Sequence, residues 1–152
     1  MPARCVLLCI GNELRGDDAA GVVLARLVGG RLAWTVIEAA TAPESFLGKI
    51  APAAPRALIL VDAIDFGAQP GEIGVFAADR LSGGGPSTHA PDPAAFLAAL
   101  QMTCPCPVAV VGIQPAGATL GADLTPPVRR AVESLAEALL CLAPRPQPHL
   151  HS

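Results

Sequence analysis

The sequence predicts an α/β protein: a three-layer α/β/α sandwich around a mostly parallel, twisted sheet of five strands. Short, continuous apolar runs alternate along the chain with segments of helical periodicity. Such runs are typical of strands buried on both faces of a parallel sheet, with helices covering those faces. A composition of 52% hydrophobic and 15% charged residues also favours a folded chain over a disordered one.

Five segments have the character of strands, because each is short, apolar and bounded by turn or helical residues. The fourth follows closely behind the third across the turn 68–72. We therefore expect a hairpin, in which the fourth strand runs antiparallel to its neighbour. The predicted strands are 5–10, 34–39, 57–65, 72–78 and 107–113.

Four further segments have helical character. Pro43, Pro126 and Pro127 stand where helix starts tolerate proline, since the first N–H groups of a helix have no partner within it. The loop 79–93 is rich in Gly, Pro and Ser, and loops of this length are usually functional or mobile. The predicted helices are 19–28, 43–51, 93–102 and 126–142.

Charge and hydropathy exclude several classes of function. The net charge is −3, with one lysine and 3% aromatic residues, so nucleic acid is not an expected partner. No apolar run approaches the roughly 18 residues of a membrane span, and the N-terminus lacks a signal-peptide cleavage pattern. We expect one cytoplasmic, monomeric domain over residues 1–143, with a flexible tail over 144–152. The cysteines lack Cys-x-x-Cys spacing, and Cys5, Cys9 and Cys141 are expected as small core residues.

Acidic and polar residues gather directly after the predicted strands. In open α/β sheets, ligands bind outside the carboxyl ends of the strands, which share one edge of the sheet. The rest of the chain is poor in charge, so this concentration is informative. The residues in question are Asn12, Glu13, Asp17, Asp18, Glu38, Thr41, Glu44, Asp62, Asp65, Thr88, His89 and Gln114.

Most of these residues have a structural alternative. Asp17 or Asp18 can cap the helix that follows, although two adjacent aspartates cannot both cap one helix well. Asp65 can cap the turn that follows it. Glu38 can be a surface acid at a strand end, and a lone His89 can be an ordinary loop residue.

Asp62 interrupts the apolar run ALILVDAI, where a buried carboxylate is costly unless it is paired, hydrogen-bonded or bound to a cation. Satisfying N–H groups of the next loop is one alternative for it. Two or three carboxylates together with an imidazole suit a divalent transition metal with open coordination positions. The spacing matches neither a zinc finger nor an HExxH helix, so the residues alone predict no more than a possible metal site.

Five short motifs occur in a fixed order along the chain. Together they resemble the hydrogenase maturation endopeptidases, the nickel-dependent processing peptidases of nickel–iron hydrogenases. Each motif is weak by itself, whereas the set in register is specific, and the similarity runs from about residue 4 to residue 142. The motifs are GNELRGDDAAG (11–21), VDAID (61–65), PGE (70–72), STH (87–89) and GIQP (112–115).

The resemblance implies an α/β sandwich with endopeptidase activity, which removes a C-terminal extension from the hydrogenase large-subunit precursor after nickel insertion. It implies that three side chains meet the nickel, and by motif position these catalytic and metal-binding residues are Asp18, Asp62 and His89. The nickel is carried by the precursor, so processing waits until the metal is present. Asp18 lies near a helix N-terminus, whose dipole favours the ionised form that a ligand needs. Asp17 is then the expected helix cap.

Two positions depart from the family pattern. Ala19 stands where the motif usually has glycine. The second strand ends in EAAT where the family commonly shows Asp-Gly-Gly-Thr, which puts a catalytic role for Glu38 in doubt. The motifs contain neither a cysteine nor a G-x-S-x-G turn, so catalysis by a serine or cysteine nucleophile is not expected.

Two other functions are alternatives. A non-cleaving, metal-checking chaperone for the precursor would use the same three ligands, and a cleavage assay separates it from a peptidase. A nucleotide-binding module is disfavoured, because GNELRGDDAAG is acidic where phosphates need bare N–H groups and does not match G-x-G-x-x-G. Whether the metal activates water or only positions the scissile bond is open at this point.

Overall fold

The structure, a computed structural model, describes residues 4–39, 47–78 and 93–146, without the side chains of residues 93–95 and 97. Its strands are β1 (Cys5–Cys9), β2 (Thr35–Glu38), β3 (Ala57–Ala63), β4 (Ile73–Ala77) and β5 (Val108–Ile113). They form one sheet in the order β2-β1-β3-β5-β4. The neighbouring strands β2, β1, β3 and β5 are parallel. This mostly parallel five-stranded sheet confirms the predicted fold class.

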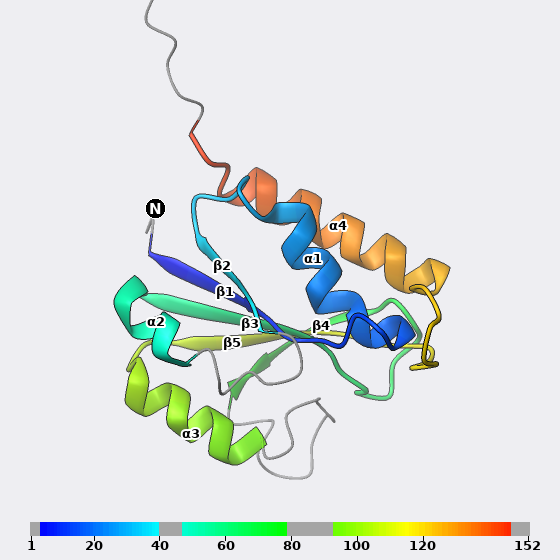
Figure 1. Cartoon of the computed structure of the whole chain (residues 1–152), viewed down its shortest axis with the longest axis horizontal. Helices are drawn as coiled ribbons and strands as arrows, with labels where there is room; N and C mark the ends of the chain where they lie inside the picture. Colours follow the sequence, from blue (N-terminus) through cyan, green and yellow to red (C-terminus); the bar gives the residue numbers. More distant parts are fainter. Residues whose placement is uncertain (1–3, 40–46, 79–92, 147–152) are drawn as a thin grey trace, which may run out of the picture.

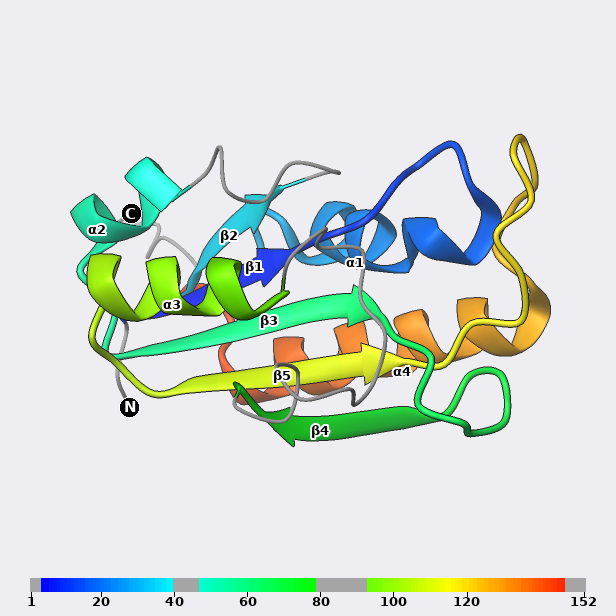
Figure 2. The ribbon, with the colours of Figure 1, turned by 90° about the horizontal axis from the view of Figure 1, so that it is seen from below.

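The fourth strand runs antiparallel, as predicted, but the predicted hairpin with the third strand is wrong. β4 pairs with β5, which lies between it and β3. Figure 2 shows β4 pointing opposite to β3 and β5. The connection before β4 is joined to the end of β5, because the N–H of Gln114 donates to the carbonyl of Glu72 (2.9 Å) and the N–H of Gly71 donates to the carbonyl of Gln114 (2.9 Å).

Helices cover both faces of the sheet. They are α1 (Ala20–Val28), α2 (Leu47–Ala53), α3 (Pro93–Thr103) and α4 (Pro126–Leu142), and a 3-10 turn, η1 (Gly16–Ala19), leads into α1. Figure 1 shows α1 and α4 on one side of the sheet, the α1/α4 face, and α2 and α3 on the other, the α2/α3 face. The predicted helices agree with these bounds, although the predicted start of the second, Pro43, lies outside the described residues. In the part of the chain that is described, no helix combines the length and the apolar character needed to cross a membrane.

Two apolar cores lie on either side of the sheet, because successive side chains of a strand point to opposite faces. In β1, Leu7 and Cys9 belong to the core beneath α1 and α4, whereas Leu8 belongs to the core beneath α2 and α3. Cys5 and Cys9 are buried, as predicted. The prediction for Cys141 is wrong, since this residue lies on the exposed side of α4.

The carboxyl ends of β1, β3 and β5 point the same way (Figure 2). The 3-10 turn η1 follows β1 in the chain and lies against β3. The predicted gathering of polar residues behind the parallel strands therefore has a common location, which we call the carboxyl edge of the sheet.

Candidate active site

Asp62 is the penultimate residue of β3, and its side chain has no exposed surface. The alternation along the strand places it on the α2/α3 face, the same side as Leu58 and Leu60. Gly112 of β5 pairs with it in register. Asp62 thus lies at the carboxyl edge of the sheet. Burial of a carboxyl group lowers the stability of a fold unless the group has partners.

An apolar wall stands next to Asp62. A β-carbon on Gly112 would come within 2.9 Å of the Ile64 side chain, so Ile64 fills the space that a larger residue would take. The rings of Phe66 and Phe76 pack edge to face beyond it, with centroids 5.3 Å apart. These side chains belong to or pack against the same core as Leu60, on the face of the sheet that carries Asp62.

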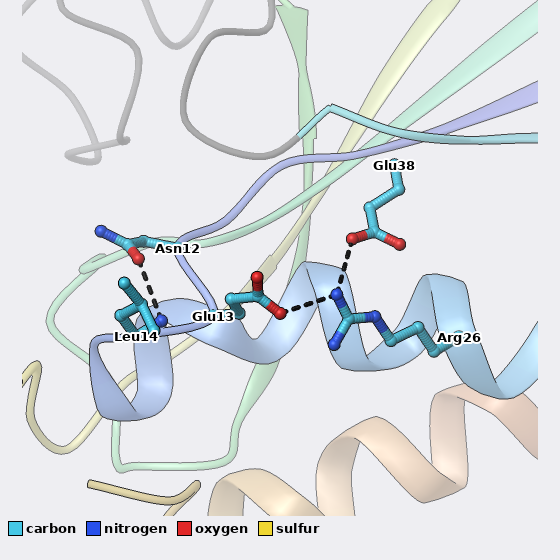
Figure 3. Close-up of polar contacts among 5 residues, drawn as sticks. All are labelled: Asn12, Glu13, Leu14, Arg26 and Glu38. Carbon is cyan, nitrogen blue, oxygen red and sulfur yellow. Dashed lines mark hydrogen bonds and ion pairs between the residues drawn. The ribbon is translucent and has the colours of Figure 1, made fainter. Parts of the chain in front are cut away.

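Asp18 lies in η1, and its residue is half-buried. The N–H of Asp18 donates to the carbonyl of Arg15 (3.0 Å), and the carbonyl of Asp18 accepts from the N–H of Asn12 (2.9 Å). The Asn12 side chain closes the same turn by accepting from the N–H of Leu14 (3.0 Å), as Figure 3 shows. The backbone of Asp18 is therefore fixed on both sides at the carboxyl edge.

Asp17 does not cap a helix, and that prediction is wrong. Neither η1 nor α1 has a side-chain cap. The buried Asp17 carboxylate instead accepts from the N–H groups of Ala116 (2.8 Å), Gly117 (3.2 Å) and Thr125 (2.7 Å), which all lie in the β5–α4 connection. The Thr125 hydroxyl also lies 3.1 Å from Oδ1 and 2.9 Å from Oδ2.

Asp65 closes a turn, as predicted: its Oδ1 accepts from the N–H of Gly67 (3.1 Å). It also accepts from the side-chain amide of Gln114 (3.1 Å). These hydrogen bonds, that from Gly67 first, lower the pKa of the Asp65 carboxyl. The carbonyl oxygen of the Gln114 side chain accepts from the N–H groups of Phe66 (2.9 Å) and Ala68 (3.1 Å). Gln114 therefore holds the loop after β3, a role that its position in the sequence did not reveal.

Glu38 is an exposed acid at the end of β2, which confirms the surface-acid alternative that the sequence analysis gave for this residue. Arg26 of α1 bridges it to Glu13, with N–O distances of 3.0 Å to Glu38 and 2.7 Å to Glu13 (Figure 3). Hydrogen bonds to these two carboxylates raise the pKa of the Arg26 guanidinium. Both glutamates thus have a partner on the exposed side of the molecule.

Two of the cysteine thiols are poor nucleophiles. Burial, and secondarily the charge of Glu38, raise the pKa of Cys9 to about 12. Burial, and secondarily the hydrogen bond with Cys104, raise the pKa of Cys106 to about 12 as well. The thiolate is the reactive form, so neither side chain is suited to attack a peptide bond at neutral pH.

The structure sorts the predicted site residues into three groups. Asn12, Glu13, Asp17, Glu38, Asp65 and Gln114 make the contacts given above. Asp18 and Asp62 both lie at the carboxyl edge. His89, with Thr41, Glu44 and Thr88, lies outside the described residues. Within the described ranges, no three His, Cys, Asp or Glu side chains are grouped so as to hold a metal ion, a search that covers Asp18 and Asp62 without His89.

Comparisons with known proteins point to one family. The HycI family model, described as hydrogenase maturation protease, matches residues 24–141. The hydrogenase 3 maturation protease of Escherichia coli K12 is 34% identical over 136 residues, which cover 88% of this chain and 87% of that protein. A crystal structure of a hydrogenase 3 maturation protease aligns with a TM-score of 0.77 and 32% identity, over 90% of this chain and 88% of the other. A nickel–iron hydrogenase maturation protease of Thermococcus kodakarensis KOD1 aligns with a TM-score of 0.80 and 31% identity, over 90% of each chain.

Proposed function

The chain belongs to the hydrogenase maturation protease family, and on that premise we propose that it removes the C-terminal extension of a nickel–iron hydrogenase large-subunit precursor after nickel has been inserted. The nickel is part of the substrate in this proposal. It serves as the recognition element, so that a precursor without metal is not cut.

The observation that carries the proposal is the buried carboxylate of Asp62 at the carboxyl edge. Asp18 contributes a second carboxylate at the same edge, on a turn that lies against β3. His89 precedes α3 by four positions in the sequence, and α3 packs through Phe96 and Leu100 on the face that carries Asp62. Two carboxylates and one imidazole are a ligand set that suits nickel and leaves coordination positions open.

The three ligands contribute to hydrolysis by fixing the substrate. Docking the precursor's nickel on Asp18, Asp62 and His89 brings the neighbouring peptide bond to the carboxyl edge. The bond is then held in a fixed geometry relative to the reacting groups, which lowers the barrier to hydrolysis. Water is then activated either by the metal, which lowers its pKa, or by a carboxylate acting as a general base. Both routes depend on the same three side chains.

The test is a cleavage assay on the precursor with and without nickel. The purified protein is mixed with the nickel-loaded large-subunit precursor, and the C-terminal extension is followed by intact mass. We expect a single cut, close after the last metal-binding motif of the precursor, and no cut in the metal-free sample. An intact nickel-loaded precursor, or equal cutting of both samples, contradicts the proposal.

A further inference from the structure

We propose that Asp17 is a positioning residue for the reaction: its carboxylate joins the β5–α4 connection to the turn of Asp18, and thereby sets where the Asp18 carboxylate stands. This inference rests on the proposed function, in which Asp18 meets the precursor's nickel. Asp17 itself is not a ligand of the metal in this proposal, because N–H groups and a hydroxyl of the β5–α4 connection engage both oxygens of its buried carboxylate.

The first step is the closure between two segments that are far apart in the sequence. Besides the bonds to its carboxylate, the N–H of Asp17 donates to the carbonyl of Gly117 (3.1 Å). The carbonyl of Leu14, in the same turn, accepts from the N–H of Gly121 (2.7 Å). The turn before α1 is therefore attached to the β5–α4 connection through side chain and backbone alike.

Gly16 shows how closely the two segments approach. Its φ of +51° lies in the left-handed region, and a β-carbon there would come within 3.3 Å of the Gly117 carbonyl oxygen and 3.4 Å of the Thr119 nitrogen. The backbones thus lie against each other directly, without an intervening side chain at this point. A change in one segment is transmitted to the other, because no flexible side chain can absorb it.

A carboxylate is the side chain that this contact requires. Its two oxygens offer about four acceptor sites and no donor, which matches three N–H groups and one hydroxyl. An asparagine at position 17 would keep one oxygen and direct an N–H₂ group at donors. An alanine would leave N–H groups in the interior without an acceptor, which is costly.

The link to Asp18 is covalent and short. Asp18 follows Asp17 in the same 3-10 turn, and the hydrogen bonds from Asn12 and to Arg15 act only within the short segment 12–18. The contacts that fix the turn to the remainder of the protein include those of Asp17. Metal ligands and reacting groups must be held to within about 0.5 Å, so a loosened turn lowers the rate even though all three ligands are present.

The experiment measures kcat and KM for cleavage of the nickel-loaded precursor, well below the Tm of each variant. Asp17→Asn is expected to lower kcat by at least about tenfold, with KM within about twofold of wild type, since catalytic geometry is sensitive to displacements of about 1 Å. Thr125→Val removes only the hydroxyl that binds Asp17 and should lower kcat several-fold. Thr125→Ser keeps the hydroxyl and should keep kcat close to the wild-type value. Thr35→Val makes the same change on the exposed β2 edge and should leave both constants unchanged.

Amide hydrogen exchange provides a second measurement that does not use activity. In Asp17→Asn, the N–H groups of Asn12 and Asp18 should exchange at least about tenfold faster than in wild type, while those of β1 keep their protection. Unchanged exchange at both positions overturns the inference.

A lower Tm with unchanged kcat in both Asp17→Asn and Thr125→Val also overturns it, because Asp17 is then only a structural anchor. Failure of the wild-type protein to cleave the nickel-loaded precursor instead contradicts the proposed function. In that case the exchange measurement still decides whether Asp17 fixes the turn of Asp18.

Discussion

The helices that cover the two faces of the sheet differ in length and in what they bury. On the α1/α4 face, helices of 9 and 17 residues pack against the sheet and against each other, and the residues that they bury are apolar or glycine. On the α2/α3 face, α2 has 7 residues and contains Pro52, and α3 has 11 residues. This second face carries the buried side chain of Asp62.

Under the proposed function, this difference separates the residues that stabilise the fold from those that act on the precursor. The net stability of a domain is small, so the fold depends on a large apolar burial. The α1/α4 face supplies it with Leu24, Val128 and Val132, all fully buried. We therefore expect substitutions in the middle of α1 and α4 to change mainly the free energy of unfolding, and substitutions at the carboxyl edge of the sheet to change mainly the rate of cleavage.

The largest effect is expected from Asp62→Ala and His89→Ala, which should each abolish precursor cleavage. Changing groups that only orient a metal ligand costs about 10–100-fold, so losing one of the three proposed ligands should cost more than about a hundredfold. Folding of each variant is measured as well, because a loss of cleavage reports on the site only in a folded protein. Cleavage is followed by mass, and folding by circular dichroism.

Glu13→Gln is the matched control for Asp62→Ala. It neutralises an acid at the same edge whose partner is the exposed Arg26, and it should leave cleavage unchanged. Normal cleavage by both Asp62→Ala and His89→Ala would show that the site has been assigned to the wrong residues.

A matched pair of leucines compares the two faces directly. Leu24 in α1 and Leu100 in α3 are both buried, with 0% and 1% exposure. Each change to Ala should lower the free energy of unfolding by about 2–5 kcal/mol, measured by urea denaturation. Leu100→Ala should in addition lower kcat several-fold, because α3 packs on the face of Asp62, whereas Leu24→Ala should keep the wild-type kcat.

The opposite result for this pair is equally informative. If Leu24→Ala slows cleavage by the folded protein while Leu100→Ala does not, the separation between a stabilising face and a reacting face is wrong. Equal losses of kcat in both variants would mean that the sheet transmits changes from either face to the carboxyl edge.

The sequence predicted what depends on local pattern and missed what depends on distant partners. The apolar run 57–65 was recognised as a strand because periodicity is a local property, and Asp62 was noticed because it interrupts that run. Asp17 was expected to cap a helix, but the Thr125 that it binds is 108 positions away. The neighbour of β4 was mistaken for the same reason, since β5 comes later in the chain. The role of His89 is still a prediction.

The smallest effect concerns Asp65, at the carboxyl edge where the two faces meet. Its pKa is lowered by the N–H of Gly67 and by the Gln114 amide, so its folded-state pKa lies below the ordinary value. A carboxylate of this kind stabilises the fold above the unfolded-state pKa of about 3.9, and that contribution is lost as the pH falls through the lower folded-state pKa. The difference in free energy of unfolding between wild type and Asp65→Asn should therefore be present at pH 7 and shrink below about pH 4, as measured by urea unfolding.

Cleavage at neutral pH should stay close to wild type, because the Asp65 side chain is exposed and its hydrogen bonds serve the turn after β3. A difference that stays constant from pH 7 to pH 3 would contradict the lowered pKa, and a large loss of cleavage would make this turn part of the reacting edge.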